Sequence, residues 1–399
     1  MKTKSTLFAL IATAACLSAR AEDAPWKDDW KSSATNIAGQ EFPKLNSERR
    51  AQIRIKAPEA KNVSINIGKP LTVTKSEDGV WTITTSPLDA GFHFYRVLVD
   101  GANVADPASE VYRGGGGGGL SSAVEVPTGE DFYELKDVPH GEVRERWYFS
   151  KTTQSWRRIF VYTPPTYDQD PSARFPVLYL QHGGGEDERG WAVQGHVSQI
   201  MDNLIAEKKA QPMLIVMERG AAQRPGEQPP AMRPPQQQQQ ANAAAPRTGA
   251  PRDFSQMFNA LDEVFIKDLI PMIDKTYRTK AAREQRAMAG LSMGGMQTRS
   301  IGMAHLDAFS HLGIFSGGSI DPTNEKEMAA LKANTPKLVF ISYGSRELGT
   351  GGRSGDPKGN VEGLNRVGIN AVFYVSPDTA HEWHTWRRSL HEFAPLLFQ

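Results

Sequence analysis

Cysteine is nearly absent from this sequence: the only one is Cys16, close to the N-terminus. A chain of 399 residues with a single cysteine forms no internal disulfide, so its core alone must stabilise it. A strong charge of one sign is also lacking, because the formal net charge is +1. This balance, without a stripe of lysine and arginine, predicts no binding to nucleic acid or to an anionic membrane surface.

Two kinds of motif are missing as well. No group of histidine, cysteine and carboxylate residues has the spacing of a metal site, and no dinucleotide-binding fingerprint is present. We therefore expect neither a metal nor an organic cofactor.

Long apolar runs are lacking except near the N-terminus, where residues 7–17 are too few to span a bilayer. Two lysines precede this run, and the small-x-small pattern Ala19-Arg20-Ala21 follows it. These features predict a signal peptide over residues 1–21, and hence secretion to the periplasm or the extracellular space after cleavage near Ala21. A lipoprotein signal ending at Cys16 is the alternative, although the residues before it fit that pattern poorly.

The next part of the chain predicts β structure. Residues 22–45 are polar and lack clear periodicity, which predicts a linker. Over residues 46–127, short runs alternate apolar and polar side chains, with turn signals such as Asp78-Gly79 between them. Strands at this spacing, without helical segments, predict a small β-sandwich. The glycine run 114–119 is typical of a loop or hinge near the boundary of that domain.

Residues 128–399 have a different rhythm. Apolar runs such as 177–180 and 287–291 alternate with amphipathic segments such as 197–208 and 258–277. This alternation predicts an α/β domain with a mostly parallel sheet flanked by helices.

One segment interrupts this rhythm. Residues 219–252 contain two Pro-Pro pairs and a run of glutamines, with almost no apolar side chain. Such a composition predicts a disordered surface insertion. A lid beside the active site is the alternative, because the segment follows a strand end.

A nucleophile motif lies between a predicted strand and a predicted helix. Gly290-Leu291-Ser292-Met293-Gly294 follows the apolar run 286–290 and precedes the helical stretch 295–304. This is the context of the nucleophile elbow in the α/β-hydrolase fold, which raises a serine hydroxyl above the sheet. We therefore predict Ser292 as the nucleophile and the Met293 amide as one donor of the oxyanion hole.

A second oxyanion donor is expected after an earlier strand. The turn His182-Gly183-Gly184-Gly185 lets an amide approach a substrate carbonyl closely. We predict the Gly184 amide as the donor and Gly183 as the second choice. We interpret His182 as a structural residue of the turn.

The base and the acid should follow the serine in chain order. His381 comes just after the last apolar run, so we predict it as the base in preference to His384 and His391, which follow in a predicted helix. Glu347 is the first carboxylate after the preceding strand and is the predicted acid. Asp356 is the alternative acid; a surface salt bridge with Arg346 or Lys358 is the alternative for Glu347.

These motifs resemble carbohydrate esterase family 1, the esterase-D-like group that includes feruloyl esterases. The likeness covers roughly residues 140–399 and is carried by residues 176–185, 268–274, 289–296 and 381–387. It implies serine hydrolysis of an aryl ester on plant cell-wall polysaccharide, with feruloylated arabinoxylan as the partner. The acid position of this group is usually an aspartate, whereas this sequence has Glu347.

The predicted sandwich resembles the immunoglobulin-like modules of carbohydrate-binding family 48, on residues 56–61, 78–81 and 91–95. Trp81 could stack on a sugar, but an aromatic residue on an alternating strand is more often part of a core. In the hydrolase part, Trp383 and Trp191 are candidates to line the pocket for the aromatic acyl group, with simple packing as the alternative.

Four other functions stay open at this point. Acetylated xylan or a siderophore ester of the enterobactin type would be another substrate for the same catalytic residues. An acyltransferase or a non-catalytic glycan-binding protein would use the same fold differently.

Overall fold

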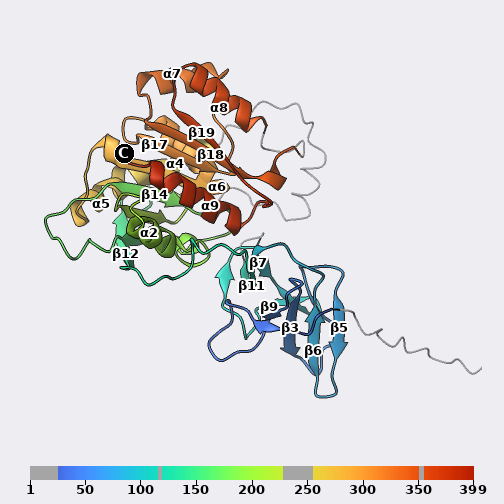
Figure 1. Cartoon of the computed structure of the whole chain (residues 1–399). Coiled ribbons are helices and arrows are strands. Elements are labelled where there is room, and N and C mark those ends of the chain that lie inside the picture. Colours follow the sequence, from blue (N-terminus) through green and yellow to red (C-terminus); the bar gives the residue numbers. More distant parts are fainter. Residues whose placement is uncertain (1–25, 116–118, 228–254, 350–354) are drawn as a thin grey trace, which may run out of the picture.

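The computed structural model describes residues 26–115, 119–227, 255–349 and 355–399 (Figure 1). The predicted signal peptide and residues 228–252 of the predicted insertion lie outside these ranges. Residues 219–227 follow β15 (Leu214–Glu218) without forming a helix or strand. The described part has two regions, an all-β region and a larger α/β region (Figure 1).

The α/β region is built on one eight-stranded sheet, whose order is β12-β13-β15-β14-β16-β17-β18-β19. β12 and β13 are antiparallel to their neighbours, and all the other pairs are parallel. The bounds are β12 (Glu142–Ser150), β13 (Ser155–Thr163), β14 (Val177–Gln181), β16 (Arg286–Leu291), β17 (His311–Phe315), β18 (Leu338–Gly344) and β19 (Ala371–Ser376). β14 to β18 are buried along their whole length, as expected for parallel strands covered on both faces.

Helices cover both faces of this sheet. One face packs against α4 (Ser255–Glu263), the π-helical segment η1 (Val264–Leu269), α5 (Ile270–Thr276), η3 (Thr298–Gly302), α7 (Glu325–Ala333) and α8 (Pro357–Arg366). The other face packs against α1 (Gly190–Val193), α2 (Val197–Ala206) and α9 (Trp383–Phe393). α6 (Met293–Gln297) and the short turns η2 (Arg283–Gln285), η4 (Ser345–Glu347) and η5 (Ala394–Leu396) complete the region. The predicted α/β-hydrolase architecture is confirmed.

The all-β region contains three small antiparallel sheets, with the orders β1-β2-β3-β6-β5, β4-β8-β9 and β10-β11-β7. The bounds are β1 (Lys31–Ser32), β2 (Lys44–Leu45), β3 (Ala51–Lys56), β4 (Val63–Ile65), β5 (Thr72–Lys75), β6 (Val80–Thr84), β7 (Gly91–Tyr95), β8 (Val97–Val99), β9 (Ala102–Val104), β10 (Tyr112–Arg113) and β11 (Leu120–Val126). Buried residues of all three sheets meet in one apolar core. Trp81 packs against this core, and its indole N–H donates to the Ala57 carbonyl at 2.9 Å.

The segment predicted as a linker is part of this region, which corrects that prediction for residues 26–45. β1 pairs with β2, and β2 pairs with β3, so the segment extends the first sheet at its edge. Each of these strands is only two residues long. A strand that short produces no alternating pattern, so it cannot be recognised from the sequence.

The two regions share an apolar core. Phe92, Tyr112 and Ala123 of the all-β region belong to the same buried cluster as Trp191 and Trp383 of the α/β region. β7 and β11 therefore lie against the α/β region, with α9 as the neighbouring helix (Figure 1).

None of the helices within the described ranges is long and apolar enough to cross a membrane.

Candidate active site

Ser292 lies in a tight turn between β16 and α6. Its backbone has φ 51° and ψ −112°, a combination that residues other than glycine rarely adopt. Its N–H donates to the Phe315 carbonyl at 2.7 Å. A Cβ on Gly290 would lie 2.5 Å from the Gly294 carbonyl carbon, and a Cβ on Gly294 would lie 2.5 Å from the Gln181 carbonyl oxygen. The turn therefore requires glycine at both positions, as the motif predicts.

His381 and Glu347 complete a hydrogen-bonded chain from the serine. His381 Nε2 is 2.9 Å from Ser292 Oγ, and His381 Nδ1 is 2.7 Å from Glu347 Oε2. An ionised carboxylate only accepts hydrogen bonds, so Nδ1 carries a proton and donates it to Glu347. Nε2 of the neutral ring is then the acceptor for the serine hydroxyl. The structure thus brings together the three residues predicted as nucleophile, base and acid.

Glu347 is held by groups that the sequence did not reveal. Its Oε1 accepts hydrogen bonds from the Gly344 N–H at 2.8 Å and from Ser316 Oγ at 2.7 Å. Trp386 Nε1 donates to the same Ser316 Oγ at 3.1 Å. Burial would raise the pKa of Glu347, but the hydrogen bonds from His381 and Gly344 outweigh it, and the net pKa is lowered. The acid is therefore kept ionised beside the histidine.

The alternative acid lies elsewhere. Asp356 is the N-cap of α8, and its Oδ1 accepts from the Gly359 N–H at 2.9 Å. This carboxylate satisfies the first turn of a helix, so Asp356 is not the partner of His381.

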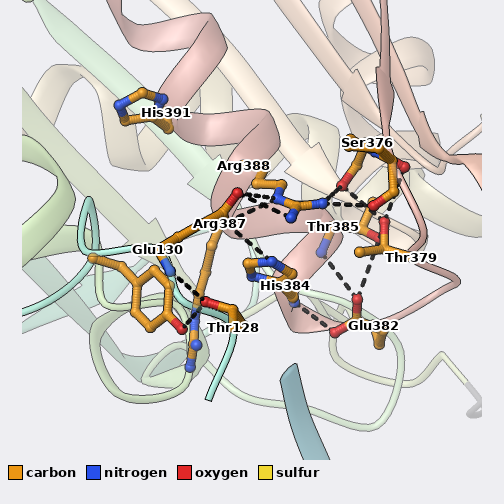
Figure 2. Close-up of polar contacts among 12 residues, drawn as sticks. Thr128, Glu130, Ser376, Thr379, Glu382, His384, Thr385, Arg387, Arg388 and His391 are labelled. Carbon is orange, nitrogen blue, oxygen red and sulfur yellow. Dashed lines mark hydrogen bonds and ion pairs between the residues drawn. The ribbon is translucent and has the colours of Figure 1, made fainter. Parts of the chain in front are cut away.

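His384 and His391 lie beside other carboxylates. Figure 2 shows His384 beside Glu130, with Nε2 3.1 Å from Glu130 Oε2, and the same carboxylate accepts from Arg388. His391 Nδ1 is 2.9 Å from Glu392 Oε1. Neither histidine competes with His381 for the role of base.

In the glycine-rich turn after β14, the amide of Gly183 is bonded within the protein and Gly184 is exposed. The Gly183 N–H donates to Glu186 Oε2 at 3.0 Å, so the second-choice oxyanion donor is already engaged. Gly184 is exposed, and a Cβ placed on it would lie 3.9 Å from Met293 Cβ. Gly184 and Met293, whose amides are the two predicted donors, are thus neighbours.

His182 stabilises this turn through hydrogen bonds of its ring. Its Nδ1 is 2.8 Å from the Gly183 carbonyl oxygen, and its Nε2 accepts from the Gly220 N–H at 3.0 Å. Burial lowers the pKa of His182, which keeps the ring neutral and Nε2 able to accept. The residue joins the turn to the loop after β15, in agreement with a structural role.

Glu186 is a residue that the sequence reasoning missed. Its Oε2 accepts from Gly183 and its Oε1 accepts from Trp383 Nε1 at 3.0 Å, so it joins the turn to α9. Burial raises its pKa to about 8, which leaves the carboxyl protonated at neutral pH. In the sequence, the only indication of this role is its position three residues after Gly183, the first glycine of the turn.

Trp191 and Trp383 do not line a pocket, which corrects their prediction as substrate contacts. Each side chain is 1% exposed, and the two rings meet edge to face with centroids 5.2 Å apart. Trp191 Nε1 donates to the Gln181 carbonyl at 3.0 Å. With both indole N–H groups satisfied inside the protein, the rings pack beneath the site instead of facing the substrate.

The all-β region contacts the loops that carry the site. Arg113 reaches Asp187, after the glycine-rich turn, at 3.6 Å, and Asp89 accepts from Arg346, next to the acid, at 2.6 Å. Arg387 in α9 is fully buried and forms a double hydrogen bond with Glu125 of β11 at 2.7 and 3.1 Å. The all-β region therefore contacts the loop after the oxyanion turn, the loop of the acid and the helix that follows the base.

No group of three or more histidine, cysteine and carboxylate residues in the described ranges could hold a metal ion.

Comparison with known families decides the class of the protein. Residues 150–396 match the model of the family Esterase, described as "Putative esterase". The chain belongs to this esterase family. Membership places the protein among the carboxylic ester hydrolases, in agreement with the elbow and its hydrogen-bonded chain.

Curated relatives of this esterase include two longer proteins named as xylanases. It is 36% identical to an endo-1,4-beta-xylanase/feruloyl esterase of Xylanibacter ruminicola over 386 residues, which is 94% of this chain and 48% of that protein. An endo-1,4-beta-xylanase Y of Acetivibrio thermocellus is 22% identical over 333 residues, 75% of this chain and 27% of that protein. The esterase thus spans about half the length of the first relative and less of the second.

Solved structures share the fold. A CE1 ferulic acid esterase of Anaeromyces mucronatus, in complex with ferulic acid, matches with a TM-score of 0.52 and 21% identity, over 67% of this chain and 96% of that chain. An enterochelin esterase of Shigella flexneri matches with a TM-score of 0.58 and 15% identity, over 93% of this chain and 95% of that chain. At these identities the matches show the α/β-hydrolase fold.

Proposed function

We propose that this protein is a secreted serine esterase that releases hydroxycinnamic acids, such as ferulic acid, from esters on plant cell-wall xylan. The observation that carries the proposal is the chain Ser292–His381–Glu347, with hydrogen-bond distances of 2.9 and 2.7 Å. The relative from Xylanibacter ruminicola supports the substrate class, because its match includes the all-β region as well as the catalytic region.

The reaction begins with proton transfer from the serine. His381 Nε2 takes the proton of Ser292 Oγ while the oxygen attacks the ester carbonyl carbon, and Glu347 stabilises the charged imidazole. The carbonyl oxygen becomes an oxyanion, which accepts hydrogen bonds from the Met293 and Gly184 amides. The C–O bond to the sugar then breaks, and His381 passes its proton to the departing sugar oxygen.

Water completes the cycle. His381 removes a proton from a water molecule as it attacks the acyl-enzyme carbonyl, a second oxyanion forms, and Ser292 leaves with the proton returned by His381. The products are the free acid and the sugar alcohol, and no metal or organic cofactor takes part in these steps.

A substrate panel tests the proposal. The purified protein is assayed with methyl ferulate, methyl p-coumarate, methyl caffeate and feruloylated wheat arabinoxylan. We expect ferulate release from the methyl ester and from the polymer. Acetate release from acetylated xylan without ferulate release would overturn the proposed acyl group.

A siderophore ester is the second candidate. The observation that favours it is the match to the enterochelin esterase, which extends over 93% of this chain and so includes the all-β region. Incubation with enterobactin, followed by chromatography of the products, separates the two candidates. We expect no cleavage at rates comparable to methyl ferulate.

Secretion is tested separately. We propose that residues 1–21 direct export, on the basis of the charged start, the short apolar run and the small-x-small pattern. Mass spectrometry of the protein from the native cell should find a mature N-terminus at Glu22. An N-terminus at Met1 would contradict this expectation.

A further inference from the structure

The hairpin of β12 and β13 extends past the edge of the sheet where Ser292 lies. β13 pairs with β15 as far as Ile159 and Glu218, and Glu218 is the last residue of β15. The tip of the hairpin therefore continues beyond the carboxyl ends of the parallel strands. Ser292 follows β16 at the same edge, three strand positions from β13, or about 14 Å at ~4.8 Å per strand.

One face of this hairpin tip carries three exposed aromatic side chains, here called the aromatic strip: Trp147, Phe149 and Trp156, which are 52%, 46% and 65% exposed. Phe149 pairs with Trp156, and Trp147 pairs with Arg158, so all three rings lie on one face. The rings of Phe149 and Trp156 meet edge to face at 5.8 Å. Grouped aromatic exposure of this kind marks a binding surface more often than scattered apolar residues do.

The opposite face of the hairpin is fixed to the core. Tyr148 Oη donates to Glu218 Oε1 at 3.2 Å, and Arg157 Nε donates to the same oxygen at 2.6 Å. Ser150 Oγ donates to Asp268 Oδ2 at 2.7 Å. The aromatic strip therefore sits on a rigid support, which lowers the entropy that binding would cost.

Polar groups along the strip connect it to the active site. Trp147 Nε1 donates to Glu145 Oε1 at 2.8 Å, which fixes the indole. Arg158 lies over the Trp147 ring at 5.8 Å and donates to Glu188 Oε1 at 2.6 Å, just after the glycine-rich turn of the oxyanion hole. On the face of the strip, the carboxylate of Glu145 lies 3.8 Å from the half-buried guanidinium of Arg158, so these two charges offset each other.

We propose that the aromatic strip binds the neutral polysaccharide chain on which the ester is carried, several sugar units from the esterified one. Sugar rings have apolar C–H faces that pack on aromatic rings, and hydroxyls at their rim that fit the Glu145 and Arg158 groups. Because the charges of Glu145 and Arg158 are paired, this face suits a neutral polymer better than an acidic one. This inference rests on the proposed function, because it assumes a polysaccharide ester as the substrate.

Activity on two substrates that share the acyl group tests the strip. The double variant Trp147→Ala/Trp156→Ala is compared with the wild type on feruloylated arabinoxylan and on methyl ferulate. We expect kcat/KM on the polymer to fall about tenfold through KM, and kcat/KM on methyl ferulate to stay unchanged. The ring-preserving variant Trp147→Phe/Trp156→Phe should recover most of the activity on the polymer, and Leu135→Ala, at a 75% exposed position off the strip, should have no effect.

A binding assay separates failure of the strip from failure of the proposed function. In a Ser292→Ala background, which does not turn over, the protein is mixed with insoluble arabinoxylan and the bound fraction is measured. The double alanine variant should bind more weakly than its parent. Equal binding and equal kcat/KM on the polymer would overturn the inference. It would also be overturned if analytical ultracentrifugation showed that the double alanine variant differs from its parent only in oligomeric state. A wild-type protein that releases no ferulate from methyl ferulate would instead overturn the proposed function.

Discussion

At the scale of single residues, Ser292 combines a strained backbone with a satisfied side chain. Its positive φ raises the hydroxyl toward His381, and the bond from its N–H to Phe315 holds that conformation. The geometry that makes the serine reactive is therefore built into the turn and does not depend on a bound substrate.

Removing the hydroxyl should abolish turnover without unfolding the protein. For Ser292→Ala we expect kcat on methyl ferulate to fall by about 10⁴- to 10⁶-fold. The thermal midpoint should stay close to that of the wild type, because the one hydrogen bond of the Ser292 side chain within the described residues is that with His381. A variant that keeps a tenth of the wild-type rate would exclude Ser292 as the nucleophile.

The identity of the acid is tested with a matched pair of amides. Glu347→Gln should lower kcat by about 10⁴-fold, because the amide no longer fixes the tautomer of His381 or stabilises its charge. Asp356→Asn keeps an acceptor for the N-cap of α8 and should change kcat less than about twofold. Both are measured on methyl ferulate, and a larger loss from Asp356→Asn would contradict the assignment.

Glu186 predicts a pH-dependent stability. Burial raises its pKa from an ordinary 4.5 to about 8, so the folded protein holds a proton that the unfolded chain releases. The contribution of this group to stability is complete below about pH 4.5 and is lost as the pH rises through about 8. Glu186→Gln should remove that loss. The Tm of the variant minus the Tm of the wild type should therefore increase as the pH is raised from 5 to 9.

The control for this measurement is Glu59→Gln, at an exposed position of the all-β region. Its Tm difference from the wild type should be flat over the same range. A flat difference for Glu186→Gln as well would show that the Glu186 carboxyl does not titrate with folding.

At the scale of elements, the elbow depends on close contact between backbones. A Cβ on Gly294 would lie 2.5 and 2.6 Å from the carbonyl oxygens of Gln181 and His182, at the end of β14. The start of α6 and the oxyanion turn are therefore in direct contact, and displacing one displaces the other.

Gly294→Ala should damage stability and catalysis together. We expect a loss of about 1–3 kcal/mol in the free energy of unfolding, from overpacking against backbone, and a fall of at least about 10²-fold in kcat. Urea unfolding and a methyl ferulate assay check the two effects. Gly119→Ala is the control, since its nearest neighbouring atom would be 3.7 Å away, and it should change neither quantity.

The sequence predicted the elements that have strong local patterns. Buried strands such as β14 and β16 appear as continuous apolar runs, and chain order after the elbow pointed to Glu347 and His381. The burial of Trp191 and Trp383 could not be predicted from the sequence, because an indole side chain suits a binding pocket and a core equally well. Partners distant along the chain, such as Ser316 for Glu347, depend on tertiary packing that local patterns do not encode.

At the scale of the whole molecule, the all-β and α/β regions share one apolar cluster of buried side chains. Phe92 and Tyr112 of the all-β region are buried with Trp191 and Trp383 beneath the active site. The fully buried Arg387 is neutralised by Glu125 of that region. The catalytic region alone would expose apolar surface and leave a buried charge without its partner.

Removing the all-β region should therefore impair the enzyme. A protein restricted to residues 128–399 is expected to be poorly soluble, or to unfold at a Tm at least about 10 °C lower, because it loses the ion pair of Arg387 and exposes the apolar side chains that the two regions bury together. Expression beside the full chain, with circular dichroism and the methyl ferulate assay, provides the measurement. A truncated protein with the kcat and Tm of the full chain would show that the two regions are independent.

The shared core also has a consequence for gene fusion and for the shuffling of modules between multidomain enzymes. Recombination at residue 127, where the sequence suggests a domain boundary, would cut through a hydrophobic core. The unit that can be moved intact into another polypeptide is the pair of regions, joined upstream of β1. The relative from Xylanibacter ruminicola fits this rule, because its similarity to this chain runs across both regions.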